Sequence, residues 1–96
     1  MRVCWTNPAL QQLEEIQDYI AQFITEAAFA LATRIREQVN KQLSAYPLSG
    51  RTGRVIETRK LVIFGTDYLV AYRIRTDVEV LAVMHGAQRW PDGFSE

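Results

Sequence analysis

Two stripes of apolar residues dominate the first half of the chain. Large apolar side chains recur at spacings of three and four over residues 10–23, and a second stripe recurs every four residues over residues 31–43. Such spacings are typical of amphipathic helices that bury one face. Asn7 before a proline predicts the N-cap of the first helix, and Thr25 predicts that of the second. The short connection between the stripes predicts that the two helices are antiparallel neighbours.

The periodicity changes after Pro47, where the second helix is expected to end. Residues 47–54 contain Gly50 and Gly53 and predict a loop. Three β-rich segments with short connections follow, which predicts antiparallel pairing, and residues 2–6 alternate as a short strand. We therefore expect an α+β fold in one domain, residues 1–96: an N-terminal strand, an antiparallel helical hairpin and a three-stranded antiparallel meander that completes one sheet, with the β-rich segments at residues 55–64, 67–75 and 78–86.

A two-residue hairpin turn at residues 76–77 would fix the register of the last two strands. Counting outward from this turn predicts the pairs Arg75–Val78, Tyr72–Leu81 and Tyr68–His85. One face of the two strands would then carry Tyr68, Val70, Tyr72, Leu81, Val83 and His85, and the other Arg73, Arg75, Val80, Ala82 and Met84. A three-residue loop would change the register, because a shift by one residue moves side chains to the opposite face.

The amino-acid composition excludes several classes of protein. The hydrophobic fraction of 48% is that of a globular domain, and no apolar run is long enough to span a bilayer. The first residues lack the apolar stretch of a signal peptide, so a cytoplasmic location is expected. The single Cys4 excludes an internal disulfide and a multi-cysteine metal site; it predicts a small buried residue, with a reactive thiol as the alternative. We expect no metal and no cofactor.

The charge balance argues against a general nucleic-acid binder. Eleven basic residues offset eleven acidic ones, and the pI is near 6.6. Nucleic-acid binding gains much of its affinity by neutralising phosphates, and usually shows as a basic domain. Residues 50–75 nevertheless carry six basic residues against two acids, Glu57 and Asp67. A local basic face is therefore possible on a neutral protein.

Four motifs in order along the second half carry a resemblance to a known family: PxSGRxGR from Pro47, TRKLVI from Thr58, YLVAYRI from Tyr68 and VxHGAQRWP from Val83. After a strand and a helical hairpin, this order resembles the RelE/ParE superfamily of toxins from type II toxin–antitoxin systems. The resemblance implies a small bacterial toxin around which the C-terminal segment of an antitoxin wraps. RelE-like members cut mRNA on the ribosome, whereas ParE-like members inhibit DNA gyrase without chemistry of their own. Fold alone does not choose between them.

The nuclease branch would need a base, an acid and cations around the phosphate. The resemblance implies an arginine at Arg59 and a histidine near the end of the last strand, His85, in such roles. Arg73 could hold a phosphate in bidentate fashion beside Arg59. Arg59, Arg73 and His85 are therefore the candidate catalytic residues of this alternative. Gly86 follows His85 where these enzymes usually carry an aromatic residue or another proton donor, so the set departs from the pattern.

Structural roles account for the same residues. A lone histidine at the end of an apolar strand usually forms hydrogen bonds there, and Tyr68 is its expected cross-strand partner. Arg59 belongs to both branches and can pair with Glu57 or with an antitoxin carboxylate. Arg73 is expected on a solvated strand face. Two tryptophans, Trp5 and Trp90, are expected to be packing anchors.

We therefore predict a ParE-like toxin that acts by binding DNA gyrase. The alternatives are a RelE-like ribosome-dependent mRNA endoribonuclease and a non-toxic antitoxin-binding scaffold. In each case the expected partner is a cognate antitoxin, whose amphipathic segment would fill an apolar groove and form a hetero-oligomer. Residues 92–96 follow Pro91 and are expected to form a mobile tail.

Overall fold

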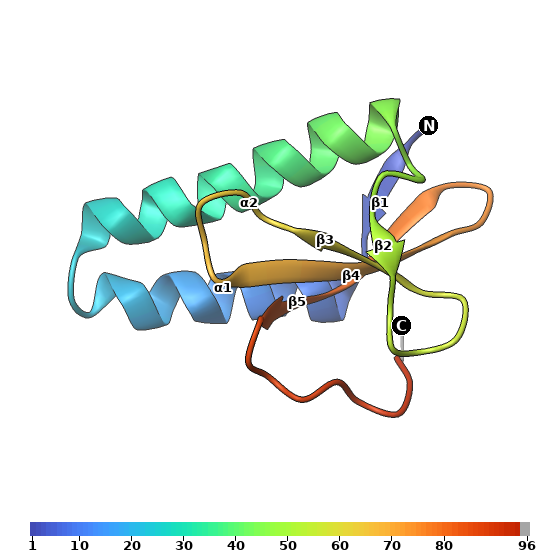
Figure 1. The fold of residues 1–96 in the computed structure, drawn as a ribbon. Helices are drawn as coiled ribbons and strands as arrows, with labels where there is room; N and C mark the ends of the chain where they lie inside the picture. The colour runs from blue at the N-terminus through green and yellow to red at the C-terminus, as the bar shows by residue number, and fades with distance from the viewer. Residues whose placement is uncertain (95–96) are drawn as a thin grey trace.

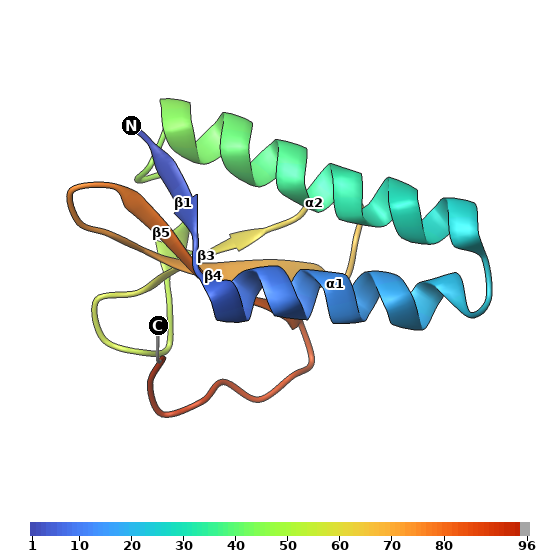
Figure 2. The same ribbon diagram turned by 180° about the vertical axis from the view of Figure 1, so that it is seen from behind.

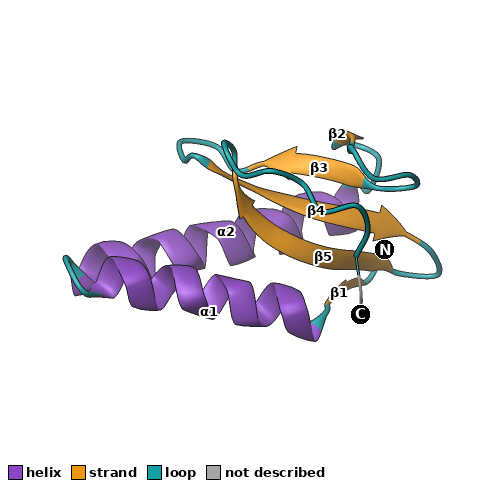
Figure 3. Cartoon of the chain, turned by 90° about the horizontal axis from the view of Figure 1, so that it is seen from below, coloured by secondary structure: helices purple, strands orange, loops and turns teal. Residues whose placement is uncertain are grey.

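The computed structural model of the chain, which describes residues 1–94, has two helices packed on one face of a mixed sheet (Figure 1). This arrangement confirms the predicted α+β class. Figure 3 shows both helices on the same side of the strands, with the segment that follows β5 on the opposite side. The elements in chain order are β1 (Val3–Trp5), α1 (Asn7–Ala21), α2 (Thr25–Ala45), β2 (Arg51–Thr52), β3 (Arg59–Val62), β4 (Tyr68–Ile74) and β5 (Val78–His85).

Both helices lie where the apolar stripes predict them, but their first residues differ from the prediction. The N-cap of α1 is Thr6, whose Oγ1 accepts a hydrogen bond from the backbone N–H of Ala9. Thr25 begins α2 itself, and the preceding Ile24 is an N-cap without a side-chain hydrogen bond. The apolar face of α2 is buried along most of its length, whereas Ile16 and Ile20 of α1 are only half-buried. The buried positions of the two helices are Ala9, Leu13, Ala28, Ala32, Ile35, Val39 and Leu43. At the ends of the first stripe Leu10 and Phe23 stay exposed.

The sheet holds five strands in the order β1-β5-β4-β3-β2. The expected meander of β3, β4 and β5 is antiparallel, and β1 adds to it parallel to β5. Figures 1 and 2 both place β1 beside β5, and the long connection that a parallel pair requires consists of both helices and the strands β2 to β4. The strand missed from the sequence is β2, in which Arg51 and Thr52 pair with the start of β3. Two residues next to glycines give no alternating pattern that could predict a strand.

The predicted register of β4 and β5 is right at one end and wrong at the other. Tyr68 does pair with His85, but Ile74 rather than Arg75 faces Val78, because the loop has three residues. A β-bulge at the level of Tyr72 restores the predicted pairing from Ala82 onward. The extra residue lies on β5, so Val80 instead of Leu81 lies opposite Tyr72 and joins the core beneath the helices.

A second, smaller cluster covers the face of the sheet away from the helices. Leu69, Ala71, Ala82 and Met84 are buried there beneath Trp90 and Phe94. The two rings meet edge to face with centroids 5.9 Å apart, a common arrangement of aromatic pairs. The expected mobile tail is therefore wrong for Phe94, which packs; residues 95–96 lie outside the described part. Trp5 packs against the main core, so both tryptophans are packing anchors as predicted.

Candidate functional site

His85 ends β5 as part of a compact turn. Its Nδ1 accepts a hydrogen bond from the backbone N–H of Ala87 at 3.1 Å, and its own backbone carbonyl accepts one from Gln88 at 2.9 Å. The ring meets Tyr68 edge to face, with centroids 5.5 Å apart. Because Nδ1 acts as an acceptor, the neutral ring carries its proton on Nε2. The expected contact with Tyr68 is confirmed.

The ring of His85 is exposed and borders an open cavity of about 370 Å³. The cavity lies between the end of β5 and the side of α1, and its other lining residues are Gln12, Glu15, Ile16, Tyr68, Val83 and Gln88. Gln12 is held in place there, because its Oε1 accepts from the backbone N–H of Val83 at 2.9 Å. The cavity thus brings one imidazole, one carboxyl and one phenol to the same place. It brings no arginine or lysine, so it offers no cation for a phosphate.

Arg59 lies on the helix side of the sheet, because it pairs directly with the core residue Tyr72. Its Nη1 donates to the backbone carbonyl of Gly50 at 2.9 Å, and that of Leu48 lies at 3.5 Å. The guanidinium therefore fastens the loop between α2 and β2 to β3. The pairing with Glu57 that the sequence allowed does not form.

The hydroxyl of Tyr72, a core residue, holds the same loop between α2 and β2. It donates to the carbonyl of Pro47 at 2.8 Å and accepts from the backbone N–H of Gly50 at 3.0 Å. Burial raises the pKa of the Tyr72 phenol above its usual value, while the Gly50 N–H and the charge of Arg59 act in the opposite direction. The group therefore stays protonated and able to donate at neutral pH.

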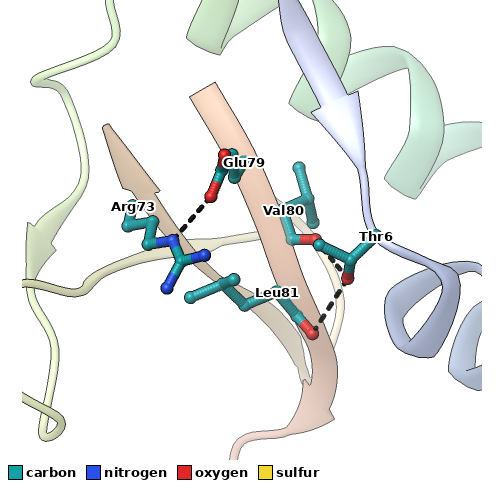
Figure 4. Close-up of polar contacts among 5 residues, drawn as sticks. All are labelled: Thr6, Arg73, Glu79, Val80 and Leu81. Carbon is teal, nitrogen blue, oxygen red and sulfur yellow. Dashed lines mark hydrogen bonds and ion pairs between the residues drawn. The ribbon is translucent and has the colours of Figure 1, made fainter. Parts of the chain in front are cut away.

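Arg73 points away from the helices, since it follows the core residue Tyr72 along β4. Its Nε donates to Glu79 Oε1 on β5 at 2.6 Å, and the arginine side chain is only 16% exposed. Figure 4 shows this pair across the two strands, with Leu81 beside it and Thr6 bonded to backbone carbonyls of β5 from the other edge. The expected solvated position of Arg73 is therefore wrong: a carboxylate and apolar neighbours hold it.

The three candidate catalytic residues do not meet in one place. Tyr68 pairs with His85, and Arg73 lies five residues further along β4, a separation of roughly 16 Å at about 3.3 Å per residue. Arg59 and Arg73 lie on opposite faces of the sheet. A phosphate held by either arginine would be out of reach of the imidazole, because general acid–base catalysis needs hydrogen-bond distances.

Exposed apolar side chains gather in three other places. Tyr19, Phe23, Ile24 and Phe29 surround the turn between the helices, Tyr46 and Leu48 follow the C-terminal end of α2, and Val62 and Phe64 lie at the end of β3. Open grooves of about 550 and 580 Å³ run along the outer side of α2 between the first two groups. Two side chains of α2, Arg34 and Gln38, hydrogen-bond the backbone of Phe64 and fix it beside these grooves.

A basic pocket of about 240 Å³ lies on the face opposite the helices. Arg54, Lys60 and Arg89 line it together with Trp90 and the turn after β5. The sequence indicated a basic face over residues 50–75, but Arg89 lies outside that range. Only the tertiary structure joins these three cations.

Two absences hold for the described residues 1–94. No group of three or more histidine, cysteine or acidic residues is placed to hold a metal ion. Neither helix is long and apolar enough to cross a membrane.

A helical hairpin packed on a five-stranded sheet is the architecture that the resemblance to the RelE/ParE superfamily of type II toxins implies. The family model described as the ParE toxin of the type II toxin–antitoxin system parDE matches residues 3–90. The chain belongs to this ParE toxin family.

The similarity to known proteins extends over nearly the whole chain. "Putative toxin Y4kP" of Sinorhizobium fredii is 46% identical over 90 residues, which are 94% of this chain and 93% of that protein. "Toxin RelE2" of Caulobacter vibrioides is 33% identical over 88 residues, covering 91% and 97%. A chain from a solved structure, "Chromosomal ParDE TA system from P. aeruginosa", superposes with a TM-score of 0.81 at 27% identity, covering 88% of this chain and 95% of that one.

Proposed function

We propose that this type II toxin acts in the cytoplasm by binding DNA gyrase and is not itself an enzyme. The observation that carries the proposal is the separation of Arg59, Arg73 and His85, which keeps the imidazole out of hydrogen-bond reach of a phosphate held by either arginine. Arg59 hydrogen-bonds the loop between α2 and β2, and Arg73 forms an ion pair with Glu79. Both side chains therefore have structural roles. A binding function needs a stable surface and no acid–base set. The family match and the ParDE neighbour support this branch.

The RelE-like alternative keeps one supporting observation, the likeness to a protein called Toxin RelE2. Under it, His85 would transfer a proton at the cavity beside α1, and Arg59 and Arg73 would bind RNA. A third possibility is a chain that binds an antitoxin and has no toxic target.

Purified toxin is expected to inhibit supercoiling by gyrase and to leave mRNA intact on translating ribosomes. The two assays are run in parallel with wild-type protein and with His85→Ala, because removal of a general acid or base typically lowers a rate by ~10²–10⁴-fold. His85→Ala should retain gyrase inhibition. Codon-dependent mRNA cleavage that disappears in His85→Ala would establish the nuclease alternative. Inactivity in both assays would point to the scaffold.

We also propose that the grooves along α2 receive an apolar segment of the cognate antitoxin. Phe64 is 83% exposed and its backbone is fixed by two side chains of α2, so it offers a large apolar contact at a defined position. Aromatic residues held in this way commonly dominate an interface.

Phe64→Asp is expected to weaken antitoxin binding about 30-fold, the effect of losing an aromatic hot spot. Ile56→Asp is the matched control, because Ile56 is 89% exposed and lies away from α2. Affinity is measured by calorimetry with the purified cognate antitoxin. Equal affinity of both variants would exclude this surface.

A further inference from the structure

The basic pocket on the open face of the sheet is built by three segments that are distant in the sequence. Lys60 points into it because Lys60 pairs with Ala71, a residue of the cluster on that face. Arg54 enters from the turn that Gly53 closes by donating its backbone N–H to Thr58. Arg89 enters from the segment that follows β5, which Trp90 anchors against the same cluster. The three cations are thus positioned by packed backbone rather than by chance on a mobile loop.

Trp90 fixes the distance between the two outer segments. A Cβ atom added to Gly53 would lie 3.0 Å from the Trp90 ring, so the indole lies directly against that turn. Leu69 supplies the apolar floor of the pocket. The pocket therefore has a rigid wall, and its volume of about 240 Å³ suits a single acidic group better than a nucleotide.

No carboxylate of the described residues neutralises these cations. The ion pairs within residues 1–94 join Arg2 to Asp77 and Arg73 to Glu79, and neither involves the pocket. The side chains of Arg54, Lys60 and Arg89 form no hydrogen bond or ion pair within that range. Like charges gathered without a counter-charge disfavour one another, and an incoming anion would relieve this repulsion.

We propose that this pocket binds a carboxylate side chain of the cognate antitoxin, within an acidic stretch of that protein. The inference rests on membership of a family that pairs with an antitoxin and does not depend on the gyrase proposal. A nucleic acid fits the observations less well, because the protein is neutral overall and the pocket is small. Arginine and lysine recognise a carboxylate through charge-assisted hydrogen bonds, which are shorter and stronger than neutral ones.

The test compares a double variant, Lys60→Gln with Arg89→Gln, against Arg36→Gln. Arg36 is an exposed arginine of α2 that does not line the pocket. The double variant is expected to bind the purified antitoxin at least tenfold more weakly, with a shallower dependence on salt between about 50 and 500 mM. Arg36→Gln should bind as the wild type does. Thermal unfolding of each variant checks that the fold is retained, and single Lys60→Gln replaces the double variant if it is not.

Two further measurements decide the nature of the anion. Each Asp or Glu of the antitoxin is changed to Lys and tested with toxin Lys60→Glu, and one such pair should restore the affinity lost in the single changes. Binding of a fluorescent DNA oligonucleotide is measured with the same toxin variants. Unchanged antitoxin affinity in the double variant would overturn the proposal. If oligonucleotide binding were lost instead, the pocket would be a nucleic-acid site.

Discussion

Gly50→Ala is expected to lower the free energy of unfolding by about 3 kcal/mol, at the upper end of the usual cost of overpacking. A Cβ atom at this buried position would come within 2.7 Å of the Lys60 carbonyl and closer still to the Tyr72 hydroxyl. The backbone N–H of Gly50 donates to that hydroxyl, so the clash also breaks a buried hydrogen bond. Neither the strand carbonyl nor the core tyrosine can move freely.

Gly93→Ala is the matched control, because nothing lies within 4 Å of a Cβ atom there. Neither glycine adopts a positive φ, so alanine causes no backbone strain at either position. Urea unfolding followed by circular dichroism measures both variants. The control should be neutral or slightly stabilising, since alanine lowers the entropy of the unfolded chain. Equal stability of the two variants would show that the loop beside Tyr72 can shift to accommodate the added methyl group at little cost in free energy.

Ile35→Ala is expected to cost about 2–5 kcal/mol, as is usual when a fully buried aliphatic side chain is truncated. Ile35 has no exposed surface and lies on the face of α2 that packs on the sheet, within the main core cluster. A domain of this size is stable by only about 5–15 kcal/mol, so the loss should shift the unfolding midpoint clearly.

The neighbouring Arg36→Ala provides the comparison within the same helix. Arg36 is exposed, and arginine and alanine have similar helix propensities. Its effect should stay within about 0.5 kcal/mol, the usual range of surface substitutions. A similar loss in both variants would mean that helix propensity, and not core packing, sets the stability of α2.

The sequence by itself determined the elements whose apolar pattern is long enough to be unambiguous. The apolar stripes that contain Leu13 and Ile35 extend over several helical turns. Because every apolar position in them fits a helical period, the pattern is not compatible with a strand. The meander followed from three β-rich segments with short connections, which leave antiparallel pairing as the only simple solution. The order of these elements carried the resemblance to the RelE/ParE superfamily.

Only the tertiary structure decided the details that depend on contacts between distant residues. The two-residue β2 forms because β3 offers it a partner, and the bulge in β5 moves Val80 into the core beneath the helices. Arg73 meets Glu79 through that register, while the same register keeps His85 far from Arg73. The pocket of Arg54, Lys60 and Arg89 exists because Trp90 packs against the sheet. One physical reason explains these four features. The local sequence pattern indicates which face of a helix or strand is buried, but packing in three dimensions selects which residue lies across from it on a neighbouring strand or loop.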